Sequence, residues 1–183
     1  MTLSPRPLAV AVALLALFLA GCGTTDGGHD DADVAFATGM VPHHQQAVEM
    51  SDLLLTKTGV DADVRDLATQ IRSEQAPEIE QMSGWLRDWD APVPAGTGME
   101  GMGTGASGDG MMSQTEMDAL THAEGRTAQT LFLQGMVGHH EGAVAMAKTE
   151  LDQGENTRAK ILASSIVTSQ QAEIDRMNRL LAG

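Results

Sequence analysis

One short phrase occurs twice in this chain and carries most of its metal-binding side chains. Residues 40–50 read MVPHHQQAVEM, and residues 136–146, which follow 96 positions later, read MVGHHEGAVAM. Each copy holds a methionine, two adjacent histidines and a second methionine. The thioether of methionine and the imidazole of histidine suit copper, above all Cu(I). The repeated phrase therefore points to soft-metal chemistry.

Helical spacing would align these side chains. Met40, His43 and Met50 lie at positions i, i+3 and i+10, so they project along one face of a helix, and the second phrase repeats this spacing. His44 follows about 100° around the helix and can point to a neighbouring helix or to solvent. Pro42 in the first copy and Gly138 in the second loosen the helical backbone beside the histidines.

A second repeated motif supplies polar groups that could reach these histidines. Gln75-x-x-Glu78-Ile79-x-x-Met82 recurs as Gln170-x-x-Glu173-Ile174-x-x-Met177, 95 positions later. In both copies the glutamine and the glutamate interrupt an apolar helical stripe. A carboxylate turned toward a core needs a partner, because burying it alone costs several kcal/mol or forces it to protonate. We expect the histidines to be that partner, with Glu78 and Glu173 as direct or indirect contributors to a metal site.

The spacing invites comparison with ferritin-like di-metal bundles, which combine lone glutamates with Glu-x-x-His motifs. Here Met40-x-x-His43 and Met136-x-x-His139 keep the spacing but replace the hard carboxylate by a thioether. That replacement favours copper over iron or manganese. Four further methionines lie in a polar, glycine-rich stretch, where we expect no core for them to fill: Met99, Met102, Met111 and Met112.

These motifs require helices to position them. Apolar periodicity predicts one pair of helices at about 33–57 and 61–89 and a second pair at about 127–151 and 156–181, with Gly59 and Gly154 at the turns. Ser113 and Glu116 form a capping-box pattern that predicts a short extra helix. The predicted fold is all-α, an antiparallel four-helix bundle built from two duplicated hairpins. A pseudo-two-fold axis should then bring Met40 and His43 close to Met136 and His139.

The N-terminal residues predict export. Residues 1–21 contain the apolar run LAVAVALLALFLA and read as a signal peptide. The following Leu19-Ala20-Gly21-Cys22 resembles a bacterial lipobox, in which the cysteine is lipidated. We therefore expect a flexible tether at 22–32 and a single domain at 33–183, divided into a repeat at 33–89, a flexible linker at 90–112 and a repeat at 113–183. The expected location is the cell membrane, lipid-anchored on its extracytoplasmic face.

Composition excludes several function classes. A net charge of −14 argues against binding to nucleic acid or to anionic lipid headgroups. Cys22 is the only cysteine, which leaves neither a disulfide framework nor a thiolate ligand in the domain. No nucleophile–base pattern and no phosphate-binding glycine loop is present, so we predict a protein that is not an enzyme. The sequence indicates a metal ion and a membrane as partners and identifies no protein partner.

Taken together, the motifs resemble a bacterial family known as domain of unknown function 305. The resemblance rests on M-x-x-H-H-x-x-A-x-x-M followed by Gln-x-x-Glu-Ile, and it spans about residues 33–181. It implies a ferritin-like four-helix bundle, export and, for some members, copper handling. The ligand set implied by position is Met40, His43, His44, Met50, Met136, His139, His140 and Met146, with Gln75, Glu78, Gln170 and Glu173 around it.

Three functions are compatible with the sequence. The first is a membrane-anchored lipoprotein that binds copper for buffering, sequestration or resistance. The second is a ferritin-like di-metal oxidoreductase, although the chain lacks a Glu-x-x-His motif and so supplies few carboxylates. The third is a metal-free interaction module at the cell surface. Metal analysis of protein purified without a His-tag separates them, because copper would support the first function, iron or manganese the second, and no metal after reconstitution the third.

Overall fold

The computed structural model describes residues 28–95 and 110–183. Within those ranges the chain forms five helices and no strand: α1 (Asp31–Thr56), α2 (Ala62–Asp88), α3 (Gln114–His122), α4 (Gly125–Gln153) and α5 (Thr157–Ala182). The all-α prediction is confirmed. The signal segment, Cys22, Met99 and Met102 lie outside the described residues. None of the helices in the described part is long and apolar enough to cross a membrane.

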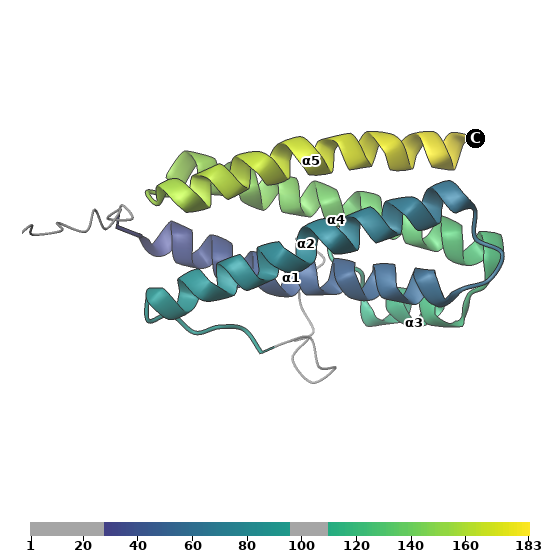
Figure 1. Ribbon diagram of the computed structural model, residues 1–183, viewed down its shortest axis with the longest axis horizontal. Coiled ribbons are helices and arrows are strands. Elements are labelled where there is room, and N and C mark those ends of the chain that lie inside the picture. The colour runs from purple at the N-terminus through teal and green to yellow at the C-terminus, as the bar shows by residue number, and fades with distance from the viewer. Residues whose placement is uncertain (1–27, 96–109) are drawn as a thin grey trace, which may run out of the picture.

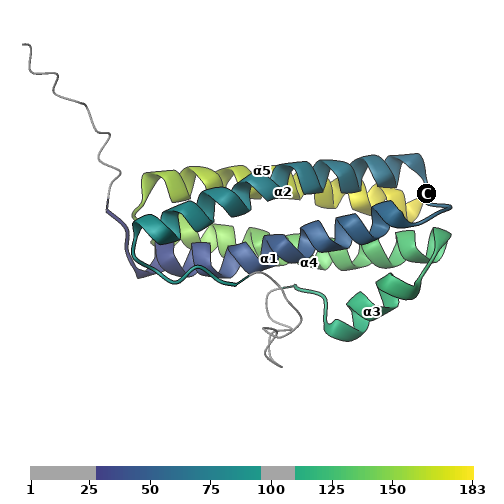
Figure 2. The same cartoon turned by 60° about the horizontal axis from the view of Figure 1, so that its bottom comes forward.

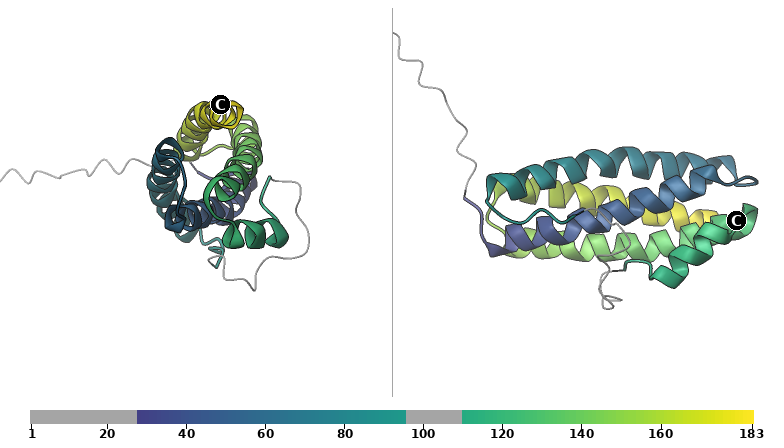
Figure 3. Two further views of the ribbon diagram at one scale, coloured as in Figure 1. Left: turned by 90° about the vertical axis from the view of Figure 1, so that its right-hand side faces the viewer. Right: turned by 90° about the horizontal axis from the view of Figure 1, so that it is seen from below.

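The four long helices form two hairpins that pack on each other (Figure 1). α1 pairs with α2, α4 pairs with α5, and α1 also packs along α4, which joins the hairpins. α2 and α5 do not pack closely backbone to backbone. The short helix α3 lies outside the four, against α4 and α1 (Figures 2 and 3).

Local sequence explains where the helices begin. Ser113 caps α3 in a capping box with Glu116, as the sequence predicts. Asp30 caps α1 in a second capping box with Asp33, which was not predicted from the sequence. The side chain of Asn156 accepts hydrogen bonds from the first backbone N–H groups of α5. Pro42 does not start α1 but lies inside it, so the helix continues through the proline.

Each hairpin fixes the start of the other hairpin's second helix. The carboxylate of Asp33 in α1 accepts a hydrogen bond from the backbone N–H of Asn156 at 2.9 Å, just before α5. At the equivalent position of α4, Gln129 bonds both the backbone N–H and the carboxylate of Asp61, just before α2, at 3.0 and 2.9 Å. The two ties are related by the repeat and hold the hairpins in one register.

A buried carboxyl group breaks this symmetry near the end of α4. Glu150 is 1% exposed, whereas the first repeat has the core residue Leu54 at the equivalent position. Burial, together with the neighbouring carboxylate of Asp33, raises the pKa of Glu150 from 4.5 to about 8. Burial acts to raise the pKa of Asp33 as well, but hydrogen bonds from the backbone of Asp30 and Asn156 lower it overall. At neutral pH the folded protein therefore keeps Glu150 protonated and Asp33 ionised.

Glu150 should make folding stability depend on pH. Because the pKa of Glu150 is raised in the folded protein, this group contributes fully to the free energy of unfolding below pH 4.5. That contribution is lost as the pH rises to about 8. We expect the unfolding free energy of the wild type to fall relative to Glu150→Gln over this range, by up to about 1.4 kcal/mol per pH unit. Denaturant unfolding from pH 4.5 to 9 measures this. Exposed Glu141→Gln is the control, and parallel curves for wild type and Glu150→Gln would contradict the assignment.

Candidate metal centre

A buried polar layer divides the core at the middle of the molecule. One hydrophobic cluster combines the C-terminal half of α1 with the N-terminal half of α4, and the other combines their opposite halves. Between the clusters lie eight residues from the two repeated motifs, which we call the histidine layer: His43, His44, Gln75, Glu78, His139, His140, Gln170 and Glu173. The two phrases therefore meet at one level of the fold.

The four histidines of this layer are closely grouped and shielded from water. His43 from α1 and His139 from α4 have ring centroids 3.7 Å apart, which is the contact that the pseudo-two-fold relation predicts. Their neighbours, His44 and His140, have ring centroids 6.5 and 6.3 Å from them. All four side chains are at most 1% exposed. The α1–α4 packing thus brings both histidine pairs into a single region.

The outer histidines bond the carboxylates of the partner helices, as the sequence predicts. Nε2 of His44 lies 2.8 Å from Oε2 of Glu78, and Nε2 of His140 lies 2.7 Å from Oε2 of Glu173. Since a carboxylate only accepts hydrogen bonds, Nε2 is the donor to the glutamate in both rings, and Nδ1 is the ring nitrogen left for another partner. Both Nδ1 atoms are buried and have no hydrogen-bond partner. A carboxylate that orients a histidine in this way is typical of metal-binding histidines.

His139 at the centre of the layer is held in its neutral form. Burial, followed by the neighbouring His43, His140 and His44, lowers the pKa of His139 well below 6.5. Its ring nitrogens make no well-formed hydrogen bond. A neutral imidazole has a lone pair that a cation can take, whereas an imidazolium has none. The electrostatics of the layer therefore keep this side chain ready to act as a ligand.

The methionines lie on both sides of the histidine layer. Met50 and Met136 belong to one hydrophobic cluster, whereas Met40 belongs to the other, with Met146 packed against it. The expectation that Met40 and Met136 approach each other is therefore wrong. α1 and α4 run in opposite directions past the His43–His139 contact. Met40 lies one turn before His43 and Met136 one turn before His139, so the two methionines lie on opposite sides of this contact. The layer has thioethers above and below it.

Residues 110–112 form a strap that crosses α1 and α4 beside the histidines. The sequence did not predict this strap. The side chain of Gln46 donates to the backbone carbonyl of Met112 at 2.9 Å and accepts from its N–H at 2.8 Å. Met112 is 6% exposed and packs over Gly135. Gly110 has φ +74° and lies against the backbone of Gly138, where any Cβ would clash. The expectation that Met112 has no core to fill is thus wrong.

The second phrase does contain a signal for this strap. Gly138 and Gly142 stand where the first phrase has Pro42 and Gln46, and Gly110 approaches the backbone of both glycines. Small residues at these positions leave space for a second backbone. The difference between the two copies, rather than their identity, marks the place where the strap lies.

Two glutamines complete the layer without hydrogen-bond partners. Gln75 and Gln170 are each 2% exposed, and both amide atoms of Gln75 and the Oε1 of Gln170 are unpaired. No set of three or more His, Cys, Asp or Glu side chains in residues 28–95 and 110–183 is arranged to hold a metal directly. The layer thus offers nitrogen and oxygen donors that are oriented singly, and the thioethers of the repeated phrases lie in the flanking clusters.

Comparison with known proteins places the chain in a family. The model of a domain of unknown function, DUF305, matches residues 33–181. The chain belongs to the DUF305 family. A DUF305 structure from Streptomyces coelicolor is 40% identical, with a TM-score of 0.72 over 82% of this chain and 91% of that one. A DUF305 fragment from Deinococcus radiodurans is 31% identical, with a TM-score of 0.73 over 84% and 97%.

A third similar structure has a bound metal. CopM in its Cu(II)-bound form is 33% identical to this DUF305 chain, with a TM-score of 0.70 over 82% of this chain and 95% of CopM. An uncharacterized protein, L153, from Acanthamoeba polyphaga mimivirus is 42% identical over 50 residues, and this match spans only 33% of the viral protein.

The neutral state of His139 should be visible in the stability of the metal-free protein. As the pH falls, a histidine whose pKa is lowered by folding becomes protonated in the unfolded chain before it does so in the folded protein. Its contribution to the free energy of unfolding is therefore full above pH 6.5 and declines as the pH falls below that value. We expect His139→Phe, which keeps a flat ring, to gain stability relative to the wild type between pH 7 and pH 5. Chemical denaturation measures the difference. Exposed His122→Gln is the control, and a difference that does not change with pH would contradict this assignment.

Proposed function

We propose that this DUF305 protein is an exported, membrane-anchored lipoprotein that binds copper for buffering, sequestration or resistance. The observation that carries the proposal is the histidine layer, in which two buried imidazoles are oriented by carboxylates and present unpaired Nδ1 atoms. The likeness to CopM, which has Cu(II)-bound and Cu(I)-bound structures, supports copper as the metal. The proposal also takes the four long helices to be a ferritin-like antiparallel bundle.

The side chains around the layer fit copper chemically. Imidazole nitrogen suits both oxidation states, and thioether sulfur favours Cu(I). His43, His44, His139 and His140 are the nitrogen ligands in this proposal, and Met40, Met50, Met136 and Met146 supply sulfur from the two flanking clusters. Glu78 and Glu173 hold the outer rings in place. Copper is the cargo of this protein rather than a resident cofactor, and we favour Cu(I).

The proposed copper site is shared by the two hairpins. His43 and His139 come from different hairpins and are in contact, so neither hairpin alone reproduces the layer. Ligands that act as a unit are strongly non-additive. Replacing His43 and His44 by alanine should therefore weaken Cu(I) binding about as much as replacing all four histidines. Competition against a chromophoric Cu(I) chelator, with protein purified without a His-tag, measures this, and circular dichroism checks the helical fold.

Other outcomes of these titrations separate the alternatives. One such outcome is that the variant with His43→Ala and His44→Ala keeps half the copper at undiminished affinity. That result would mean that the chain has two independent sites and no shared site. Iron or manganese in the purified protein would favour the di-metal oxidoreductase. A protein that takes up no metal after reconstitution would favour the interaction module.

The proposed lipid anchor makes a separate prediction. Cys22 would carry the lipid, and the described helices offer no other means of spanning a membrane. We expect Cys22→Ala to yield a folded protein that leaves the membrane fraction, because a soluble domain without its acyl chains has little membrane affinity. Fractionation with a salt wash measures the distribution. Retention of the variant in the washed membrane pellet would defeat the anchor assignment.

A further inference from the structure

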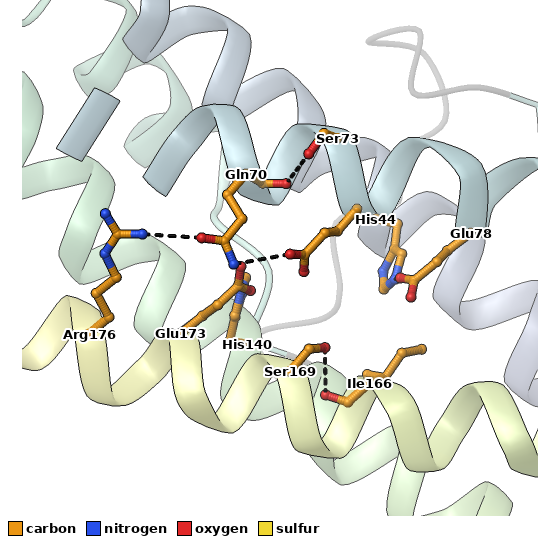
Figure 4. A network of polar contacts seen from close by, with 10 residues as sticks. His44, Gln70, Ser73, Glu78, His140, Ile166, Ser169, Glu173 and Arg176 are labelled. Atoms are coloured by element: carbon orange, nitrogen blue, oxygen red, sulfur yellow. Dashed lines mark hydrogen bonds and ion pairs between the residues drawn. The ribbon is translucent and has the colours of Figure 1, made fainter. Parts of the chain in front are cut away.

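Carboxylates gather on the side of the molecule where α2 and α5 face each other. Glu74 and Glu78 lie on α2 and Glu173 lies on α5. Glu78 lies beside His44, and Glu173 lies beside His140 (Figure 4). Glu74 lies one turn before Glu78 on α2. Its Oε1 accepts a hydrogen bond at 3.0 Å from Gln70, which accepts at 3.1 Å from Arg176, one turn after Glu173 on α5. Burial raises the pKa of Glu74, and the charges of Glu173 and Glu78 also act to raise it. We call these three carboxylates the acidic mouth.

The carboxylates of the acidic mouth are increasingly buried toward the histidine layer. Glu74 is half-buried, the side chain of Glu78 is 19% exposed, that of Glu173 is 5% exposed, and His44 and His140 are fully buried. Negative charge therefore continues from the surface to the rings. A row of like charges at a partly desolvated site concentrates counter-ions there and speeds their arrival.

Polar atoms inside the acidic mouth lack partners. Oε1 of Glu173 is buried and unpaired, although its Oε2 bonds His140. One turn away, Gln170 has an unpaired Oε1, and across on α2 Gln75 has both amide atoms unpaired. Buried polar atoms without hydrogen bonds cost free energy and call for an explanation. Oxygen atoms on both helices are thus available to a polar ligand.

The other sides of the histidine layer are more closed. α1 packs closely on α2 and on α4, and α4 packs closely on α5. The strap at Gly110 and Met112 additionally crosses the α1–α4 side beside Gly138. α2 and α5 lack this close packing. The acidic mouth therefore lies on the side of the histidine layer where the two flanking helices do not pack closely.

We propose that Glu74, Glu78 and Glu173 form an encounter site for hydrated metal cations and that, if the proposed copper function holds, copper enters through it. These side chains are not arranged for direct coordination, so the cation keeps its water shell and is held through it. Arg176 stands at the edge of the site, where it donates to Gln70 at 3.1 Å. Its positive charge opposes the approach of a cation. Glu74 is thus a positioning residue for uptake and not a ligand of the histidine site.

Mn²⁺ tests the encounter site independently of copper binding. Mn²⁺ prefers oxygen ligands and is paramagnetic, so it broadens the NMR signals of nearby amides. We expect selective broadening at residues 70–78 and 169–176 in the wild type and at least a threefold weaker effect in Glu74→Gln. Exposed Glu80→Gln, which removes the same charge from another face of α2, should behave as the wild type. Broadening elsewhere, or equal broadening in Glu74→Gln, would overturn the encounter site.

Uptake kinetics test the route. Cu²⁺ quenches tryptophan fluorescence, and Trp85 and Trp89 are the only tryptophans of the chain. At low salt we expect Glu74→Gln to slow quenching about threefold and Arg176→Gln to speed it, with unchanged equilibrium affinity, and high salt should remove both effects. Equal rates in all variants would overturn the route. A wild type that shows the Mn²⁺ effect but binds no copper would instead refute the proposed copper function and leave the encounter site standing.

Discussion

Burial of the histidine layer is the constraint on which the rest of the structure depends. Polar groups at the centre of a core lower stability unless each finds a partner, so the helices must sit in the register that pairs them. His44 reaches Glu78 within one hairpin, His140 reaches Glu173 within the other, and His43 meets His139 between hairpins. An apolar layer of the same volume would tolerate sliding of the helices. The layer thus specifies the fold at a cost in stability.

The two halves keep what the layer needs and differ elsewhere. The double histidines and the Gln-x-x-Glu motif are common to both repeats. Gln46 and Gly142 differ because one clamps the strap and the other makes room for it. Leu54 and Glu150 differ although both are buried, so the carboxyl group in α4 has no counterpart in α1. Both of these differences lie where α4 meets another part of the chain, the strap in one case and Asp33 of α1 in the other.

Much of this organisation could be predicted from sequence, because helical periodicity and duplication are local or internal signals. The helices, the capping box at Ser113 and the pairing of histidines with Glu78 and Glu173 follow from spacing alone. The separation of Met40 from Met136 could not be read from spacing, since it depends on the direction in which α4 crosses α1. The docking of Met112 was also missed, because composition describes a segment's average polarity and not a single side-chain clamp.

The reciprocal ties at the helix ends have the form of a symmetric dimer interface. Asp33 of one hairpin holds the start of α5, and Gln129 of the other holds the start of α2. In an isologous contact residue i touches j and j touches i, which is the relation seen here within one chain. A half-length ancestor with a single hairpin would therefore have had to pair with a copy of itself to bury its polar layer. Fusion of two such genes would have freed each half to acquire its own features, among them the strap and the buried acid of α4.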